Sequence, residues 1–359
     1  MPKHLLALPL LAAALASSLP AAARPKLVLA VVIDQFRYDY LTRFRASYTG
    51  GLNRLLTQGS VFTNAHYDHF PTVTAIGHST FMSGATPAIS GIIGNDWFDR
   101  ATGKSVTSVS DSTVRILGGK GDGGASPRRL LVSTLGDELK IADKNTRVIG
   151  ISLKDRSAIL PVGHMADGAY WFDGTSGAFV SSTHYFPDLP GWVKDFNAAR
   201  PADKFAGAVW KSDDGKTVFK TMAAAPGEAL YKSIPASPYS NELIEAFCER
   251  AISAEQLGRH GATDLLAVSF SGNDYVGHDQ GPDSPQVRDM AIRADRLLGK
   301  LFQYLDSEIG MSNVVVVLTA DHGVAPVPEV SAARKMPGGR MSGCIIQSTV
   351  QNKLAAKYG

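Results

Sequence analysis

The sequence has little cysteine and almost no net charge, and each shortage excludes a class of protein. The two cysteines, Cys248 and Cys344, are too few for a disulfide framework, and neither belongs to a metal-binding Cys-x-x-Cys pair. A single disulfide between them is an open alternative in an oxidising compartment. The formal charge of +3 argues against a nucleic-acid-binding protein, which would show clustered lysine and arginine, and against electrostatic membrane binding.

Long apolar runs are also missing, except near the N-terminus. Residues 1–23 contain Lys3, a run of leucine and alanine, and three alanines that end at Ala23. This pattern predicts a secretory signal peptide that is cleaved after Ala23. Prolines and serines interrupt the segment and leave its apolar core too short to cross a bilayer of about 30 Å. We therefore expect an exported protein, periplasmic or secreted, with no membrane span after signal cleavage.

Four short apolar runs, rich in β-branched residues, divide the rest of the chain. They are apolar at nearly every position, as strands buried on both faces of a parallel sheet need to be. The runs are Leu27 to Ile33, Val148 to Leu153, Leu265 to Phe270 and Val314 to Leu318. Between the last two, apolar residues recur at three- and four-residue spacing from Val287 to Leu305, as in an amphipathic helix. The alternation predicts a doubly wound α/β fold, with a mostly parallel sheet flanked by helices.

Other segments give weaker signals. Ser126 and Pro127 are typical of an N-cap and a first helical residue, which predicts a helix to about Ile141. Residues 157–239 break the alternation because they are rich in glycine, proline, serine and aromatic residues, although 169–172 and 178–182 have the pattern of a hairpin. We expect a cap or insertion subdomain there, within one catalytic domain that spans residues 24–359.

Polar residues follow each apolar run, where a strand would leave the core. They are Asp34 after the first run, Lys154, Asp155 and Arg156 after the second, Ser271, Asn273 and Asp274 after the third, and Asp321 and His322 after the fourth. One such residue is usually an ordinary loop residue. Because ligands in open α/β sheets bind outside the carboxyl ends of the strands, four such groups together predict a site at that edge.

Several of these residues have the chemistry of metal ligands. Asp274 and His278 form an Asp-x-x-x-His pair, Asp321 and His322 are adjacent, and Asp34 stands alone. A mixture of carboxylate and imidazole ligands suits Zn²⁺ or a similar transition metal better than Ca²⁺, which prefers oxygen ligands.

A nucleophile is expected between residues 71 and 78, where a loop should turn into a helix. A hydroxyl at a helix N-terminus gains stabilisation of its alkoxide, and the free N–H groups there can hold a phosphoryl oxygen. The spacing does not separate Thr72 from Thr74. Either residue could also be a simple helix cap.

Taken together, these residues resemble the alkaline phosphatase superfamily, and in particular the monomeric bacterial alkaline phosphatases with a threonine nucleophile. Related to them are the nucleotide pyrophosphatase/phosphodiesterases. The resemblance is carried, in order, by the segments Val31–Gln35, Pro71–His78, Gly91–Trp97, Ser152–Arg156, Asn273–His278 and Thr319–Gly323.

The resemblance implies roles for individual residues and two bound Zn²⁺ ions. It assigns the nucleophile to Thr74. One Zn²⁺ would be held by Asp34, Thr74, Asp321 and His322, and the other by Asp274, His278 and a further histidine. Asn95 would donate a hydrogen bond to one phosphoryl oxygen, with Lys154 and Arg156 on the others.

The function that this resemblance implies is zinc-dependent hydrolysis of small phosphate monoesters through a phosphothreonine, by a protein that we expect to be a monomer. The alternative is a nucleotide phosphodiesterase/pyrophosphatase, but those relatives are not expected to have the Lys154-Asp155-Arg156 element. A monoester carries one more anionic oxygen than a diester, and the two cations match that charge.

The end of the sequence does not fit the resemblance. No histidine follows His322, whereas the family's last metal ligand lies well downstream. We therefore expect an incomplete chain whose second metal site lacks one ligand. A rival hypothesis is a truncated, non-catalytic module that binds one metal and a phosphorylated ligand.

Overall fold

The four apolar runs form four adjacent, parallel strands of a central sheet. The structure, a computed structural model, describes residues 24–119 and 123–359, so the expected signal peptide lies outside the described residues. The sheet has the strand order β13-β1-β12-β7-β8-β9-β5. These strands span Val314–Thr319, Leu27–Ile33, Asp264–Phe270, Val148–Ser152, Gly168–Asp173, Ala178–Ser182 and Ile116–Leu117, respectively. Pairing is parallel from β13 to β8 and antiparallel at β9 and β5, which confirms the mostly parallel sheet.

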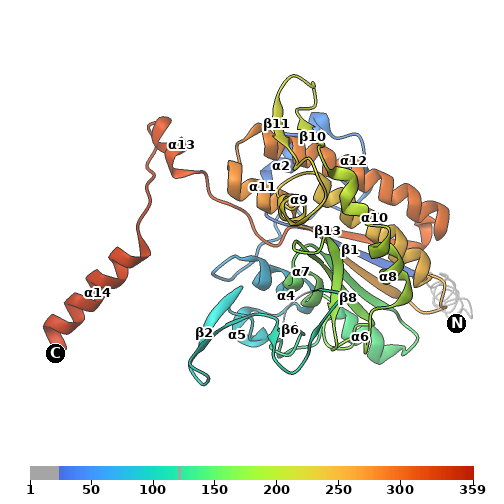
Figure 1. Ribbon diagram of the computed structural model, residues 1–359, viewed down its shortest axis with the longest axis horizontal. Coiled ribbons are helices and arrows are strands. Elements are labelled where there is room, and N and C mark those ends of the chain that lie inside the picture. Colours follow the sequence, from blue (N-terminus) through green and yellow to red (C-terminus); the bar gives the residue numbers. More distant parts are fainter. Residues whose placement is uncertain (1–23, 120–122) are drawn as a thin grey trace, which may run out of the picture.

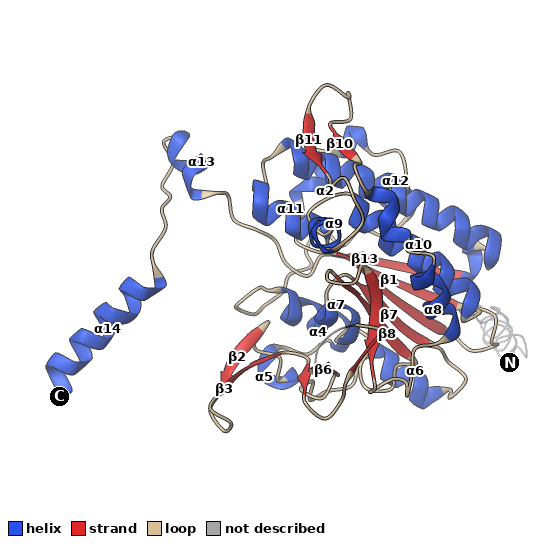
Figure 2. Cartoon of the chain, in the orientation of Figure 1, coloured by secondary structure: helices blue, strands red, loops and turns tan. Residues whose placement is uncertain are grey.

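Helices cover both faces of this sheet (Figure 2). One layer contains α3 (Gly51–Gln58), α8 (Gly191–Ala198), α10 (Tyr239–Ala254), α11 (Gly272–Gln280) and α12 (Pro285–Glu308), and the other contains α4 (Thr74–Ser83), α6 (Leu135–Ala142) and α7 (Asp155–Ile159). Side chains alternate between the two layers along β1, where Leu29 and Val31 pack in one core and Ala30 in the other. The central strands are therefore buried on both faces, as their composition predicts.

Strand β13 departs from this expectation. It lies at the edge of the sheet, and Val315 and Val317 are 45% and 40% exposed, whereas Val314 and Val316 pack against the larger core. Among the described residues, no helix covers the face of this strand that carries Val315 and Val317. The prediction of a strand there is confirmed, but its burial on both faces is wrong.

The helix predicted from Pro127 begins eight residues later, at Leu135. Thr134 is its N-cap and forms a capping box with Asp137, which satisfies free N–H groups at the helix start. Ser126 instead donates a hydrogen bond to Asp111 Oδ2 at 2.6 Å. The prediction of this helix start is therefore wrong, because a stronger cap lies downstream.

The segment 157–239 contributes to both the sheet and one helix layer. Its hairpin is confirmed as β8 and β9, which continue the central sheet. Beyond it, the hairpin of β10 (Val209–Lys211) and β11 (Val218–Thr221) is tied to α12 by a 2.6 Å hydrogen bond from Trp210 Nε1 to Asp289 Oδ2. A cap role for this segment stays a prediction.

The remaining elements are short or lie outside the two layers. Near the chain end, α14 extends away from the body together with α13 (Figure 1). Bounds of these elements are α2 Asp39–Arg43, α5 Pro87–Ser90, α9 Glu228–Ser233, α13 Pro328–Ala333, α14 Gly343–Tyr358, β2 Asp96–Asp99, β3 Lys104–Thr107, β4 Ser110–Asp111, β6 Gly124–Ala125, and the 3-10 turns Arg45–Ser47, Pro201–Phe205 and Met311–Asn313. No helix within the described ranges is long and apolar enough to cross a membrane.

The cysteines do not pair. Cys248 is a buried free thiol in α10, and Cys344 is an exposed free thiol in α14. The open alternative of a disulfide between them is therefore not formed in this structure.

Candidate active site

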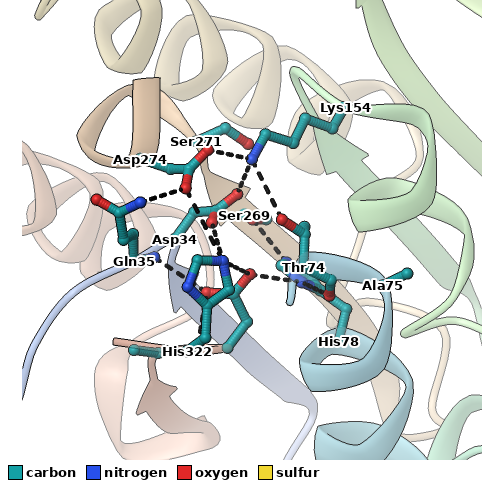
Figure 3. Close-up of polar contacts among 12 residues, drawn as sticks. Asp34, Gln35, Thr74, Ala75, His78, Lys154, Ser269, Ser271, Asp274 and His322 are labelled. Atoms are coloured by element: carbon teal, nitrogen blue, oxygen red, sulfur yellow. Dashed lines mark hydrogen bonds and ion pairs between the residues drawn. The ribbon is translucent and has the colours of Figure 1, made fainter. Parts of the chain in front are cut away.

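The carboxyl ends of the parallel strands bring the predicted metal ligands together (Figure 3). Asp34 follows β1, Asp274 lies in the first turn of α11 after β12, and His322 follows β13. One carboxylate oxygen from each aspartate and a ring nitrogen of His322 all lie within 4.8 Å of one another. Asp321 is fully buried beside them, with Oδ2 3.8 Å from His322 Nε2. Four residues from three segments that are far apart in the sequence thus form one cluster.

Lys154 is the cation at the centre of this cluster. It follows β7, and its Nζ lies 2.7 Å from Asp34 Oδ2 and 2.5 Å from Asp274 Oδ2. Burial lowers the pKa of Lys154, but the charges of the two carboxylates outweigh burial and raise that pKa above its ordinary value. The side chain is therefore held as an ammonium between two acidic groups.

The structure separates the two candidate nucleophiles. Thr74 is the first residue of α4 and is only 3% exposed, and its hydroxyl lies 3.4 Å from Lys154 Nζ. Thr72 is exposed in the loop that precedes the helix. The hydroxyl that faces the cluster is thus that of Thr74.

Two oxygen atoms of the cluster fit a bound cation. Asp34 Oδ1 and Asp321 Oδ2 are buried and accept no well-formed hydrogen bond from any described residue, although His78 Nδ1 lies 3.2 Å from the latter. Burial raises the pKa of Asp34 well above its ordinary value, and the charge of Asp321 raises it further. Burial also raises the pKa of Asp321, but His78 and His322 outweigh burial and lower that pKa. Buried carboxylates beside an imidazole are the donor set of a divalent transition metal.

Three predicted residues lie at the margin of the cluster. The His278 ring is 67% exposed, and its Nε2 lies 3.1 Å from Asp274 Oδ1. Asn95 accepts a 2.8 Å hydrogen bond from the backbone N–H of Ala75 in α4, so its amide nitrogen is the donor left for a ligand. Arg156, in α7, has a buried Nε with no partner among the described residues.

Two buried residues without a predicted role, Gln35 and His78, contact the predicted ligands. Gln35 donates from its backbone N–H to Asp321 Oδ1 at 3.0 Å and from its side-chain amide to Asp274 Oδ1 at 2.9 Å. His78 Nδ1 lies 2.9 Å from the carbonyl oxygen of Thr74, and its Nε2 lies 2.8 Å from Ser269 Oγ. The available signals were the position of Gln35 next to Asp34 and the four-residue spacing between Thr74 and His78 on one helix face.

Comparison with known proteins places this chain in a family. Residues 28–337 match the family described as Type I phosphodiesterase / nucleotide pyrophosphatase. Alkaline phosphatase PhoV of Synechococcus elongatus is 44% identical, with 89% of this chain and 62% of the relative covered. Alkaline phosphatase PafA of Elizabethkingia meningoseptica is 41% identical, with 88% and 63% covered. A relative from Myroides odoratus that is named a calcium-transporting ATPase is 40% identical, with 94% and 66% covered.

A crystal structure of alkaline phosphatase PafA has the same fold. It superposes with a TM-score of 0.86 at 39% identity, over 94% of this chain and 70% of that chain. A PafA variant that carries substitutions of one threonine, one asparagine, one lysine and one arginine matches with a TM-score of 0.84. The chain spans about three fifths of the length of the curated relatives it matches. It belongs to the type I phosphodiesterase / nucleotide pyrophosphatase family, within the alkaline phosphatase superfamily.

Proposed function

We propose that this chain is a metal-dependent phosphate-monoester hydrolase in which Thr74 is the nucleophile and Zn²⁺ is the metal. The observation that carries the proposal is the position of the Thr74 hydroxyl, 3.4 Å from the Lys154 ammonium, which itself lies between Asp34 and Asp274. A hydroxyl, a cation and metal-binding carboxylates are the parts that phosphoryl transfer requires. Two similar relatives are named alkaline phosphatases, which supports the same reaction class.

In this proposal, Asp34, Asp321, His322 and Thr74 hold one metal ion, and Asp274 and His278 contribute to a second. The ions would supply Lewis-acid stabilisation of the attacking and leaving oxygens and would lower the pKa of the Thr74 hydroxyl. Thr74 Oγ1 then attacks phosphorus in line with the leaving alcohol and becomes a phosphothreonine. Attack by water on that ester releases inorganic phosphate and regenerates the hydroxyl.

The chain's own donors would orient the phosphoryl group. Thr74 begins α4, so free backbone N–H groups at the start of this ten-residue helix add partial positive charge beside the nucleophile. Asn95, Lys154 and Arg156 would each donate to a phosphoryl oxygen. The replaced lysine and arginine of the PafA variant are two positions apart in that protein, as Lys154 and Arg156 are here.

Lys154 and Arg156 also decide between ester classes. A monoester dianion needs one more neutralising contact than a diester, and an ammonium and a guanidinium supply that contact. The family description favours a second candidate, hydrolysis of a nucleotide diester or pyrophosphate. The name of the Myroides odoratus relative adds ATP as a substrate to test.

The test is a rate comparison with Zn²⁺ present, using an aryl phosphate, the matched bis-aryl phosphate and ATP. We expect the monoester to be cleaved fastest, and both Lys154→Ala and Arg156→Ala to lower that rate more than the diester rate. Faster cleavage of the diester, or variants with an unchanged monoester rate, would assign the chain to the phosphodiesterases.

Metal content tests the rival hypothesis of a non-catalytic module. About two Zn²⁺ per chain with turnover supports the enzyme, and about one with no turnover supports the module.

Export, directed by the predicted signal peptide, and a monomeric state belong to the same proposal. Fractionation of cells and size-exclusion chromatography would test them.

A further inference from the structure

Gln35 joins the two groups of predicted metal ligands through one residue. Its backbone N–H donates to Asp321, and its side-chain Nε2 donates to Asp274, at 3.0 and 2.9 Å. The two aspartates come from different strand ends, after β13 and β12. Figure 3 shows Gln35 beside Asp274, on the opposite side of the cluster from Thr74. No other described residue donates hydrogen bonds to both of these carboxylates.

The orientation of the Gln35 amide follows from charge. An ionised carboxylate only accepts hydrogen bonds, so the amide nitrogen must face Asp274. The amide oxygen then points toward Gly277 of α11, where an added Cβ would lie 2.0 Å from Oε1. Glycine at position 277 thus leaves the space that the amide needs.

The backbone of Gln35 has an unfavourable conformation. Its φ is +59°, in the left-handed region that a residue with a Cβ rarely adopts. The chain turns sharply here, since Phe36 N–H donates to the carbonyl oxygen of Ile33 at 3.2 Å. Glycine would fit this conformation more easily. A strained, 1% exposed glutamine at such a position indicates that its side chain serves the site rather than the turn.

We propose that Gln35 is a positioning residue that fixes Asp274 and Asp321 relative to each other and so sets the affinity of the site for its metal. The inference rests on the metal site of the proposed function. A hydrogen bond to the carboxylate oxygen that does not bind the metal restricts the rotamer of that aspartate. It thereby orients the other oxygen toward the metal. Because the contact to Asp321 comes from the backbone, side-chain substitutions remove only the contact to Asp274.

Two substitutions separate a positioning role from a structural role. Gln35→Ala removes the amide and keeps the backbone strain, whereas Gln35→Gly removes the amide and relieves the strain. We expect both variants to bind Zn²⁺ about 10- to 100-fold more weakly than the wild type. Without metal, the glycine variant should melt at a higher temperature than the alanine variant. If the role of Gln35 were purely structural, Zn²⁺ affinity would instead follow the melting temperature, and the glycine variant would bind Zn²⁺ more tightly than the alanine variant.

Gln256 provides a matched control. It is a second glutamine with a positive φ, +51°, but it is exposed in the turn after α10. Gln256→Gly and Gln256→Ala should show the same order of melting temperatures and unchanged Zn²⁺ affinity.

The experiment is titration of the purified chain with Zn²⁺ against a competing chelator, with Co²⁺ absorption spectra as a second readout of ligand geometry. Weaker Zn²⁺ binding and a changed Co²⁺ spectrum in both Gln35 variants would support the inference. Affinity within twofold of the wild type and an unchanged spectrum would overturn it and leave the proposed function intact. A wild-type chain that binds neither metal would overturn both.

Discussion

The Lys154 ammonium lies 3.4 Å from the Thr74 hydroxyl, although the two residues are 80 positions apart in the chain. The same ammonium contacts Asp34 and Asp274, so one cation joins the candidate nucleophile to the candidate metal ligands. A phosphoryl group bound to Thr74 would therefore lie next to a positive charge. This geometry is what a reaction with a negatively charged transition state requires.

Removal of that cation should destabilise the metal-free protein. In Lys154→Met, the buried carboxylates of Asp34 and Asp274 lose their counter-charge, and breaking a buried ion pair on one side costs about 3–5 kcal/mol. Added Zn²⁺ should recover much of the loss. Urea unfolding with chelator and with Zn²⁺ measures both effects. Lys194→Met is the control, because its ion pair with Asp188 is exposed and should matter little. Equal stability of Lys154→Met and the wild type in chelator would count against this account.

His78 should support the cluster through its hydrogen bonds. The ring is fully buried and lies 3.2 Å from Asp321 Oδ2 and 2.8 Å from Ser269 Oγ. His78→Leu removes these contacts and leaves buried polar atoms unpaired, at a cost of about 1–3 kcal/mol. His78→Asn keeps an N–H donor near the position of Nδ1 and should retain more Zn²⁺ affinity than His78→Leu. Competition with a chelator measures the Zn²⁺ affinity of each variant. Equal affinities of the two variants would disprove the predicted order.

Close packing between α4 and the end of β13 should make Gly77 intolerant of a side chain. A Cβ at position 77 would lie 2.1 Å from the backbone oxygen of Asp321, which cannot move without shifting the loop that carries His322. Overpacking of this kind costs about 1–3 kcal/mol or more. Gly77→Ala should therefore lower the melting temperature and weaken Zn²⁺ binding. Gly191→Ala is the matched control, since a Cβ there meets no atom within 4 Å.

Stability should also depend on pH through Glu245, a residue of α10 that is not part of the cluster. Burial and the nearby Glu249 raise the pKa of this carboxyl and Lys300 lowers it, so that the net pKa is about 7. The folded state therefore binds a proton that the unfolded state has released, so Glu245 contributes stability below its ordinary pKa. As the pH rises from about 4.5 to about 7, the free energy of unfolding therefore falls by up to about 3 kcal/mol.

The check is the free energy of unfolding of Glu245→Gln between pH 4.5 and 8. The variant should lose this part of the pH dependence and should exceed the wild type most clearly at pH 8. Glu242→Gln, in the same helix, controls for the change of net charge. An unchanged pH profile in Glu245→Gln would refute the assignment.

The sequence predicted the sheet and the cluster because both depend on local patterns. A run such as Leu27–Ile33 is apolar at every position, and the first polar residue after it, Asp34, had to lie at the strand end. The wrong helix start at Ser126 had a competing local signal, the Thr134 and Asp137 capping box. The exposed Val315 could not be predicted, since burial of an edge strand depends on which helices cover it.

The contacts that organise the site were beyond local reasoning. Gln35 reaches Asp274 across 239 positions, and His78 reaches Ser269 across 191. Neither residue type nor spacing encodes such pairs, because they are set by the strand order of the folded sheet. The choice between Thr72 and Thr74 is of the same kind, since only the start of α4 shows which hydroxyl faces Lys154.

The central claim is that Thr74 accepts the phosphoryl group, and one measurement tests it directly. The Zn²⁺-loaded chain is mixed with an aryl phosphate, quenched in acid within the first turnovers, digested and analysed by peptide mass spectrometry. The account predicts phosphate on Thr74, and none after Thr74→Ala. Hydrolysis of the aryl phosphate with phosphate on Thr72, or with no phosphorylated threonine in either protein, would contradict it.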